Sequence, residues 1–231
     1  MKNRLRSVSL MAIIFMISIQ TQAQKRVGYI VQLDSMIKQL HLGMTSFTNF
    51  SSVYSLPFEL QHYTETRLER TFGNEELELT KVDPQLYQGY INIKNTLTKK
   101  EFKVYQEEWF KQLKKEYQIE ALMVIHSAVL EPYKQQNIET ELGQIAMTHE
   151  NNKTYVRVFM DMEAVLFVSG KGKTAQGKTS FIKKDNFPGL RSKTTPYTEE
   201  EIGLLEYPLR ELIQIQLEEI MESKAFKKMI Q

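Results

Sequence analysis

Residues 119–130 constrain the fold more than any other segment, because they are apolar on both alternating faces. One face would carry Ile119, Ala121, Met123 and Ile125, and the other Leu122, Val124 and Ala128. A strand that is apolar on both sides is typical of the middle of a sheet that is covered on both faces. The sequence therefore predicts a layered sheet with this segment near its centre.

Two amphipathic helices are predicted before this strand. One apolar stripe recurs at intervals of three and four residues: Phe102, Tyr105, Trp109, Leu113 and Tyr117. An aromatic stripe of this kind is far more often a core face than a ligand site, so we expect a helix over 102–117 that packs on the sheet. An earlier helix is predicted from about 58 to 72, with Pro57 at its first turn and Gly73 after its end.

Residues 155–168 show the most regular strand pattern in the chain. Apolar side chains occupy every second position: Val156, Val158, Met160, Met162, Ala164, Leu166 and Val168. This length predicts one strand of a long hairpin, whose partner would be 138–148 across a turn at 150–153. Shorter strands are predicted at 40–50 and 76–82.

The sequence pattern is ambiguous in residues 26–40 and clear in the C-terminal segment. Residues 26–40 give an ambiguous pattern, in which an apolar start precedes a brief helix capped by the polar pair at 34–35. At the other end, Thr198 and Glu201 form a capping box. The apolar positions that follow predict a long C-terminal amphipathic helix: Ile202, Leu205, Leu209, Leu212, Ile213, Leu217, Ile220 and Met221.

The order of predicted elements indicates the fold class. Strand, helix, strand, helix, strand, hairpin strands and helix predict an α/β (α+β) fold, a mixed β-sheet with helices packed on it and a long β-hairpin. Residues 170–197 are predicted to be a basic loop rich in Gly and Lys, and 198–230 a helical segment. Pro208 should kink this helix or start a new one. We expect 24–231 to form a single domain.

The first 23 residues have the three parts of a secretory signal peptide. Lys2, Arg4 and Arg6 form a positive head, an apolar run covers 8–19, and small residues at 21–23 match a cleavage site. The run is shorter than the roughly 20 residues of a spanning helix, which favours a cleaved signal over the alternative of an uncleaved anchor. We therefore expect a soluble mature protein that begins near Gln24 and is periplasmic or secreted.

Composition excludes several function classes. The chain has no cysteine, so it forms no disulfide, no thiolate metal site and no lipid attachment through cysteine. The formal charge is +2 for the whole chain, and it falls to −1 when the three basic residues of the signal are removed. A nearly neutral protein gives no argument for nucleic acid as a partner.

The segment from Gly172 to Thr179 matches the phosphate-binding loop pattern G-x-x-x-x-G-K-[ST]. Such a loop requires a helix that begins at its Lys-Thr pair, and further parallel strands after it. Phe187-Pro188-Gly189 interrupts the chain soon afterwards, and nucleotide triphosphates are scarce outside the cytoplasm. We therefore interpret the match as a basic loop and expect no cofactor.

The candidate catalytic and metal-binding residues are few. The four histidines, at 41, 62, 126 and 149, do not show a metal-binding spacing. His126 is expected to be the buried one, as a hydrogen-bonded core residue. Asp161 and Glu163 would share one face of a strand and could act as an acid/base pair, although Arg157 beside them favours a solvated sheet surface.

Charge is segregated along the C-terminal third of the chain. Between 171 and 193 the chain has one acidic residue and seven basic residues: Lys171, Lys173, Lys178, Lys183, Lys184, Arg191 and Lys193. Between 198 and 222 the chain has eight glutamates and one basic residue, an arginine. The two segments could fold against each other or stay solvated. Alternatively, the basic segment could bind an anionic partner, such as lipid headgroups, acidic polysaccharide or an acidic protein surface.

The order of elements over about 40–168 also supports a loose resemblance. It is carried by the strand ending in Thr45-Ser46-Phe47, the helix 58–72, the strand 76–82, the helix 102–117 joined directly to Ile119-Glu120-Ala121-Leu122-Met123-Val124, and the following hairpin. In this order the chain resembles the small α/β domain at the amino terminus of the Tol-system propeller protein and in the periplasmic part of the curli secretion channel. The Gln22-Ala23-Gln24 ending of the signal also looks like exported proteins of the Bacteroidota.

The resemblance implies a non-enzymatic binding or assembly role at the cell envelope, with another envelope protein or an anionic envelope component as the partner. No integral membrane segment is expected after signal cleavage. The alternative hypothesis is a periplasmic hydrolase that uses Asp161 and Glu163 as its acid and base.

Overall fold

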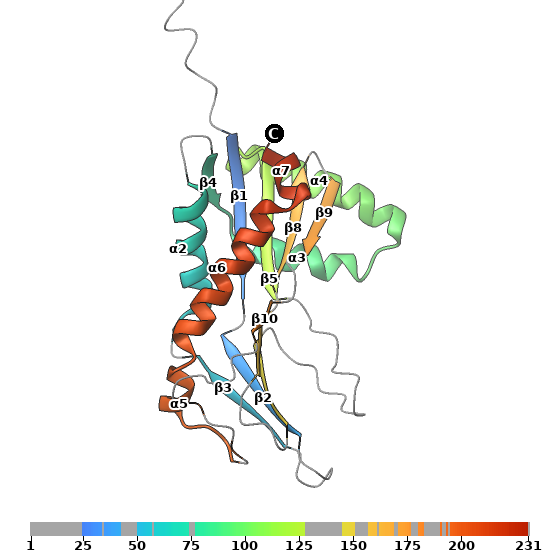
Figure 1. Ribbon diagram of the computed structural model, residues 1–231. Coiled ribbons are helices and arrows are strands. Elements are labelled where there is room, and N and C mark those ends of the chain that lie inside the picture. The colour runs from blue at the N-terminus through green and yellow to red at the C-terminus, as the bar shows by residue number, and fades with distance from the viewer. Residues whose placement is uncertain are drawn as a thin grey trace, which may run out of the picture.

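The computed structural model describes residues 25–33, 35–42, 50–56, 58–73, 77–127, 145–150, 157–160, 162–168, 171–176, 180–182, 190, 193 and 195–230 (Figure 1). The strands are β1 (Lys25–Gln32), β2 (Met36–Leu42), β3 (Phe50–Ser55), β4 (Leu77–Lys81), β5 (Ala121–Ser127), β6 (Ile145–Glu150), β7 (Arg157–Met160), β8 (Met162–Val168), β9 (Lys171–Gln176) and β10 (Ser180–Ile182). The helices are α2 (Leu60–Phe72), α3 (Pro84–Lys94), α4 (Lys99–Tyr117), α5 (Glu199–Gly203), α6 (Glu206–Glu222) and α7 (Lys224–Ile230).

The larger part of the molecule is built on a mixed sheet, here called sheet A, with the strand order β4-β1-β5-β8-β9. Strands β4, β1 and β5 are parallel, and β8 and β9 are antiparallel to their neighbours. The prediction of a central strand is confirmed, since β5 lies in the middle and the side chains from Ala121 to Ile125 are 0% exposed. The predicted α/β class, a mixed sheet with helices packed on it, is therefore confirmed.

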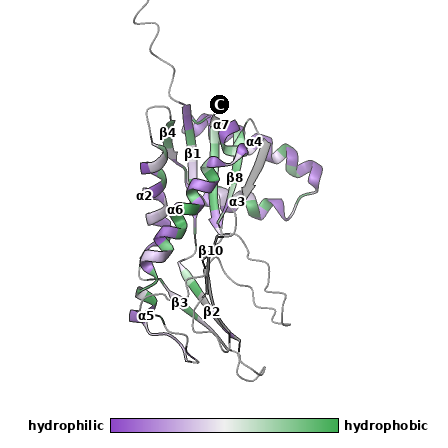
Figure 2. Cartoon of the chain, in the orientation of Figure 1, coloured by the Kyte–Doolittle hydropathy of each residue, from purple (hydrophilic) through white to green (hydrophobic). Residues whose placement is uncertain are grey.

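Helices cover both faces of sheet A. One core cluster places Leu68 of α2, Leu212 of α6 and Phe226 of α7 against one face. A second cluster places the aromatic stripe of α4 and two tyrosines of α3 against the other face. Apolar residues concentrate on the strands, and the outer surfaces of the helices are more polar (Figure 2). Burial of both faces explains why β5 has no polar face.

The second core cluster needs a glycine on β1. A Cβ atom at Gly28 would lie 2.6 Å from Ile119 Cδ1 and 3.0 Å from Val82 Cγ2. These distances are shorter than ordinary van der Waals contact, so a larger residue would displace the side chains that follow α4 and β4.

A second sheet, here called sheet B, has the order β10-β7-β6-β2-β3 and lies beyond the carboxyl end of β1 (Figure 1). The brief helix predicted within 26–40 is wrong, because Met36–Leu42 is a strand paired with β3 and β6. The strand predicted at 40–50 is also wrong in extent. Strand β2 ends at Leu42 and β3 begins at Phe50, so the pattern had joined parts of two strands.

The long strand predicted at 155–168 is divided between the two sheets. Strand β7 belongs to sheet B and pairs with β6, with Thr148 opposite Arg157, whereas β8 belongs to sheet A. A hairpin is thus present, but it ends at Met160 and is shorter than predicted. Alternation of apolar residues continues across the division, which explains why the pattern indicated one strand. Buried Gln216 of α6 accepts a hydrogen bond from the Met162 backbone N–H at 2.9 Å, where β8 begins.

Two further segments differ from the prediction. Helix α3 was not predicted, although Asp83 caps it by accepting from the Gln85 N–H at 2.9 Å and Pro84 stands at its first position. The predicted loop at 170–197 contains strands β9 and β10.

The capping box of Thr198 and Glu201 is confirmed, at the start of α5. Helix α6 then begins at Glu206 with Pro208 in its first turn, so Pro208 lies in a new helix. Within the ranges that the structure describes, no helix combines the length and the apolar character needed to cross a membrane.

Candidate functional site

The structure places the predicted basic residues in different environments. Lys171 and Lys173 belong to β9, the edge strand of sheet A, in register with Val168 and Leu166. Lys193 precedes α5. The other four lie outside the described residues: Lys178, Lys183, Lys184 and Arg191.

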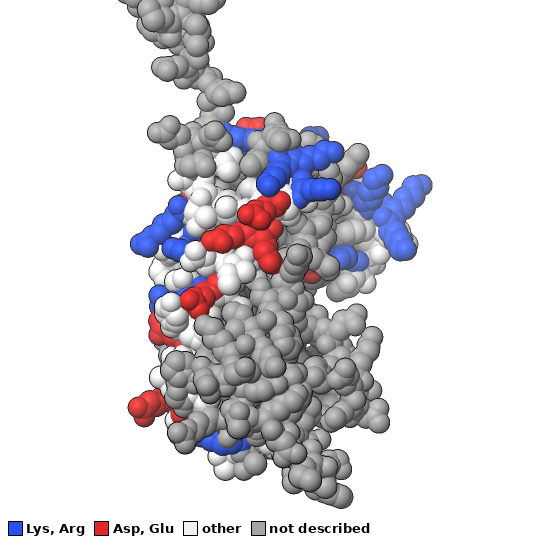
Figure 3. Space-filling view, in the orientation of Figure 1, with Lys and Arg blue, Asp and Glu red and all other residues white. Residues whose placement is uncertain are grey.

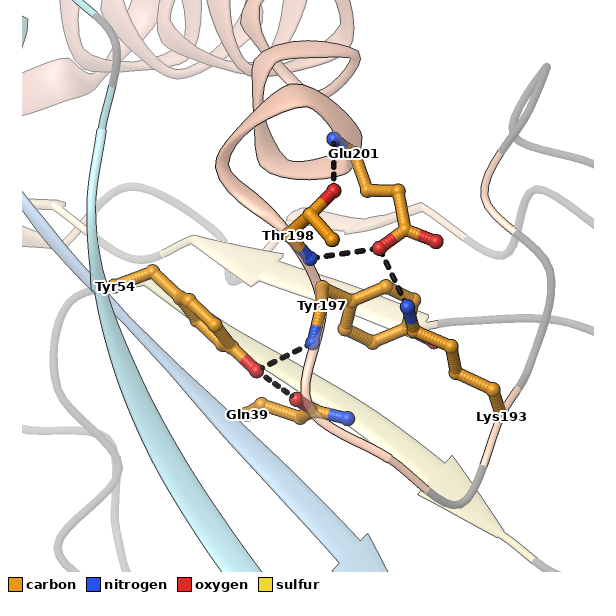
Figure 4. A network of polar contacts seen from close by, with 6 residues as sticks. All are labelled: Gln39, Tyr54, Lys193, Tyr197, Thr198 and Glu201. Atoms are coloured by element: carbon orange, nitrogen blue, oxygen red, sulfur yellow. Dashed lines mark hydrogen bonds and ion pairs between the residues drawn. The ribbon is translucent and has the colours of Figure 1, made fainter.

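Lys193 takes part in a polar network that joins the start of α5 to sheet B (Figure 4). Its ammonium group forms an ion pair with Glu201 and lies 4.8 Å from the centre of the Tyr197 ring. This ion pair, together with the Thr198 backbone N–H that donates to the same carboxylate at 2.7 Å, holds the pKa of Glu201 below its usual range. Lys193 is therefore engaged in a structural contact rather than presented for a partner.

The network continues into sheet B through a chain of hydrogen bonds. The Tyr197 backbone N–H donates to the Tyr54 hydroxyl at 2.8 Å, and that hydroxyl donates to the side-chain oxygen of buried Gln39. Burial raises the pKa of Tyr197 to about 12. These bonds satisfy polar groups that would be costly to bury alone, so they fix α5 against β2 and β3.

Three basic residues that sequence reasoning missed lie on α7. Lys224, Lys227 and Lys228 are exposed, and none of them forms an ion pair with a carboxylate of the described residues. Phe226 on the opposite side is buried, with its ring 5.2 Å from that of Phe72. The signal in the sequence is an apolar Phe226 among lysines at helical spacing.

Helix α7 packs on β8 and β9, at the end of the molecule that lies away from sheet B (Figure 1). Figure 3 shows blue side chains gathered at this end of the molecule and a red group of α6 below them. Of the predicted contacts between the basic and acidic segments, the described residues provide the pair of Lys193 with Glu201. We call Lys224, Lys227 and Lys228 the lysine end.

A pocket of about 280 Å³ lies on the other face of sheet A, beneath α3 and α4. Its lining residues come from both helices and from β5 and β8: Tyr87, Tyr90, Ile91, Lys94, Phe102, Gln106, His126, Glu163 and Val165. This is the carboxyl end of β5, and open α/β sheets commonly bind ligands at the carboxyl ends of their parallel strands. The pocket is therefore a second candidate site.

Glu163 is half-buried in this pocket and stands directly opposite His126 in the register of β8 and β5. Asp161 lies outside the described residues, and Arg157 belongs to sheet B. The continuous strand that would have placed these three side chains on one face is thus not formed. The expectation that His126 is the buried histidine is wrong as well, because it is half-buried whereas His41 of β2 is 1% exposed. Burial lowers the pKa of His41.

No group of three His, Asp or Glu side chains within the described ranges could hold a metal ion. The phosphate-loop match also has a different backbone from a nucleotide site. Lys171–Gln176 is an antiparallel strand and Ser180–Ile182 is another strand, where a nucleotide loop would continue as a helix.

Comparison with known proteins gives little further information. No protein-family model matches the chain, and no curated protein matches it. Among solved structures, the chain is similar to a hypothetical protein, CT253, from Chlamydia trachomatis, at 15% sequence identity and a TM-score of 0.37. That match covers 85% of this chain and 96% of the other.

Proposed function

We propose that this chain is a non-enzymatic, exported binding protein of the cell envelope whose lysine end contacts an anionic surface. The observation that carries the proposal is the arrangement of Lys224, Lys227 and Lys228 on α7. All three are exposed, and none is neutralised by a described carboxylate. The signal-like residues 1–23 support an exported location, because they combine a positive head, an apolar run and a cleavage site.

Helix α7 suits electrostatic contact better than insertion into a bilayer. Its apolar residue Phe226 is held in the core against Phe72, so the helix does not offer that side chain to lipid. Each lysine near an anionic membrane surface contributes about 1 kcal/mol, so three lysines together provide useful but reversible binding. Among anionic envelope components we favour lipid headgroups, since three exposed ammonium groups on one helix match an extended anionic surface better than a single ligand.

The test is co-sedimentation of the protein with vesicles, using variants of equal charge change. We would compare the wild type, a triple variant of α7 (Lys224→Gln, Lys227→Gln and Lys228→Gln) and a matched triple variant of α4 (Lys99→Gln, Lys100→Gln and Lys103→Gln). The control lysines are also exposed. Vesicles of neutral phosphatidylcholine would be compared with vesicles containing phosphatidylglycerol.

The wild type should bind only the anionic vesicles and lose binding as salt is raised, because salt screens exposed charges. The α7 variant should bind at least about tenfold more weakly, whereas the α4 variant should bind nearly as the wild type does. Equal losses in the two variants would show that net charge, rather than the lysine end, is responsible. Absence of binding to anionic vesicles by the wild type would remove the proposed partner.

A further inference from the structure

The pocket beneath α3 and α4 has rigid aromatic walls. The rings of Tyr87 and Tyr90 are stacked with centroids 5.7 Å apart, and Phe102 lies 5.1 Å from Tyr90. Tyr90 is in turn packed on Trp109 at 4.4 Å, which belongs to the core cluster on this face of sheet A. Because the walls are part of the core, the pocket is preformed. Its volume of about 280 Å³ suits a ligand smaller than a nucleotide.

Two acceptors lie side by side at the sheet end of the pocket. The His126 ring contacts the Ser127 carbonyl oxygen through Nδ1 at 3.0 Å, and a carbonyl only accepts, so Nδ1 carries the proton. In the neutral ring Nε2 is then an acceptor. Directly opposite in register is Glu163, whose half-buried carboxylate forms no hydrogen bond or ion pair with any described residue. Adjacent acceptors beside aromatic rings are the chemistry that binds an ammonium group.

Two donors also line the pocket. Lys94, the last residue of α3, contributes an exposed ammonium group that makes no ion pair with Glu163 or with any other described carboxylate. The Tyr87 hydroxyl has no hydrogen-bond partner among the described residues, and burial together with the Glu163 charge raises its pKa to about 12. This hydroxyl therefore stays protonated at neutral pH and can donate to an anionic group.

Separated charges of opposite sign on an aromatic pocket fit a ligand that itself carries both charges. We propose that this pocket binds a small amino-acid zwitterion with an aromatic or large apolar side chain. The ammonium group of the ligand meets Glu163 and His126, its carboxylate meets Lys94, and its side chain lies against Tyr87, Tyr90 and Phe102. The site is on the opposite face of sheet A from α7, so it is independent of the lysine end.

Trp109 provides a direct reporter of binding. It is the single tryptophan of the chain, and its ring contacts Tyr90 of the pocket wall. We would record its fluorescence while adding one of three probes to the folded protein. L-Phenylalanine carries both charges, phenethylamine carries only the ammonium group, and 3-phenylpropanoate carries only the carboxylate. Phenylalanine should give a saturable change at a lower concentration than either single-charge probe.

Two variants test which residue of the pocket binds each charged group of the ligand. Glu163→Gln should weaken phenylalanine and phenethylamine about tenfold and leave 3-phenylpropanoate unchanged, because a charge-assisted hydrogen bond to the ammonium group is lost. Lys94→Gln should weaken phenylalanine and 3-phenylpropanoate and spare phenethylamine. Glu107→Gln and Lys103→Gln, at exposed positions of α4 outside the pocket, are the matched controls and should bind all probes as the wild type does.

Three results would overturn the proposal. The first is a wild-type protein whose fluorescence does not saturate with phenylalanine. The second is tight binding of a single-charge probe, equal to that of phenylalanine. The third is a loss in the pocket variants no larger than in the matched controls. Circular dichroism of each variant confirms that it is folded before binding is compared.

Discussion

Sheet B relies on polar contacts more than sheet A does. Sheet A lies between two layers of helices, and five consecutive residues of its central strand are fully buried. Sheet B keeps apolar residues at its surface, with Met36 39% and Val53 53% exposed. Its contact with the start of α5 combines the burial of Ile37 and Ile202 in one core cluster with the hydrogen bond that the Tyr197 backbone N–H donates to the Tyr54 hydroxyl. The ion pair of Glu201 with Lys193 joins α5 to the residues that precede it.

This difference predicts how strongly a substitution in each region reduces stability. Apolar burial adds up over many contacts and depends little on pH. A hydrogen-bonded network depends on each partner, since removal of one leaves another buried polar group unsatisfied. We therefore expect large, pH-independent losses from core changes in sheet A, and smaller, pH-dependent losses at the contact of sheet B with α5.

The largest effect is expected from Phe167→Ala in β8. Phe167 is 0% exposed and packs on Tyr90, Trp109 and Phe110, with centroids 5.3 to 6.0 Å away. Removal of a buried ring leaves a cavity and should cost about 3–5 kcal/mol of unfolding free energy. Urea denaturation monitored by Trp109 fluorescence measures the loss. A loss below about 1 kcal/mol would mean that this core does not dominate stability.

Tyr54→Phe should have a smaller effect, confined to sheet B and α5. The change removes one hydroxyl, and leaves the Tyr197 N–H and the Gln39 side chain without their partner. The expected cost is about 1–3 kcal/mol. Hydrogen exchange should become faster in 195–203 while 121–127 stays protected. Equal acceleration in both segments would contradict the separation of the two regions.

The smallest effect is the response to acid. The ion pair with Lys193 lowers the pKa of Glu201 in the folded protein, so its contribution is complete above the ordinary Glu value of 4.5. That contribution is lost as the pH falls further, through the lowered folded value. Protection of 195–203 against exchange, corrected for intrinsic rates, should thus decline below about pH 4.5. Glu201→Gln should weaken protection at neutral pH and flatten this decline, and an unchanged pH profile would exclude Glu201 as its source.

The sequence reveals much of sheet A because its local patterns and its burial agree. The two-sided apolar run around Met123 identifies the central strand, and the stripe that includes Trp109 identifies α4. Sheet B was not predicted, since parallel pairing of β2 with β6 joins segments more than 100 residues apart. No local pattern records such a pairing. The division between β7 and β8 was hidden for a related reason, because the alternation is the same in both sheets.

The residues of the candidate sites could also be predicted only in part from the sequence. The sequence predicts Glu163 as an acid/base candidate and His126 as a core residue, and it does not predict that the two are neighbours. The register between β5 and β8 is what places them together. Tyr87 and Lys94 could not be assigned to the pocket, because α3 itself was not predicted. Lys224, Lys227 and Lys228 could have been found from sequence spacing alone.

The chain crosses between the two sheets over very short distances. Strand β1 ends at Gln32 and β2 begins at Met36, and β7 ends at Met160 while β8 begins at Met162. Both crossings lie at the carboxyl end of β1. A third connection is equally short, because β9 of sheet A ends at Gln176 and β10 of sheet B begins at Ser180. Three short connections at one end of sheet A limit how far sheet B can move relative to it.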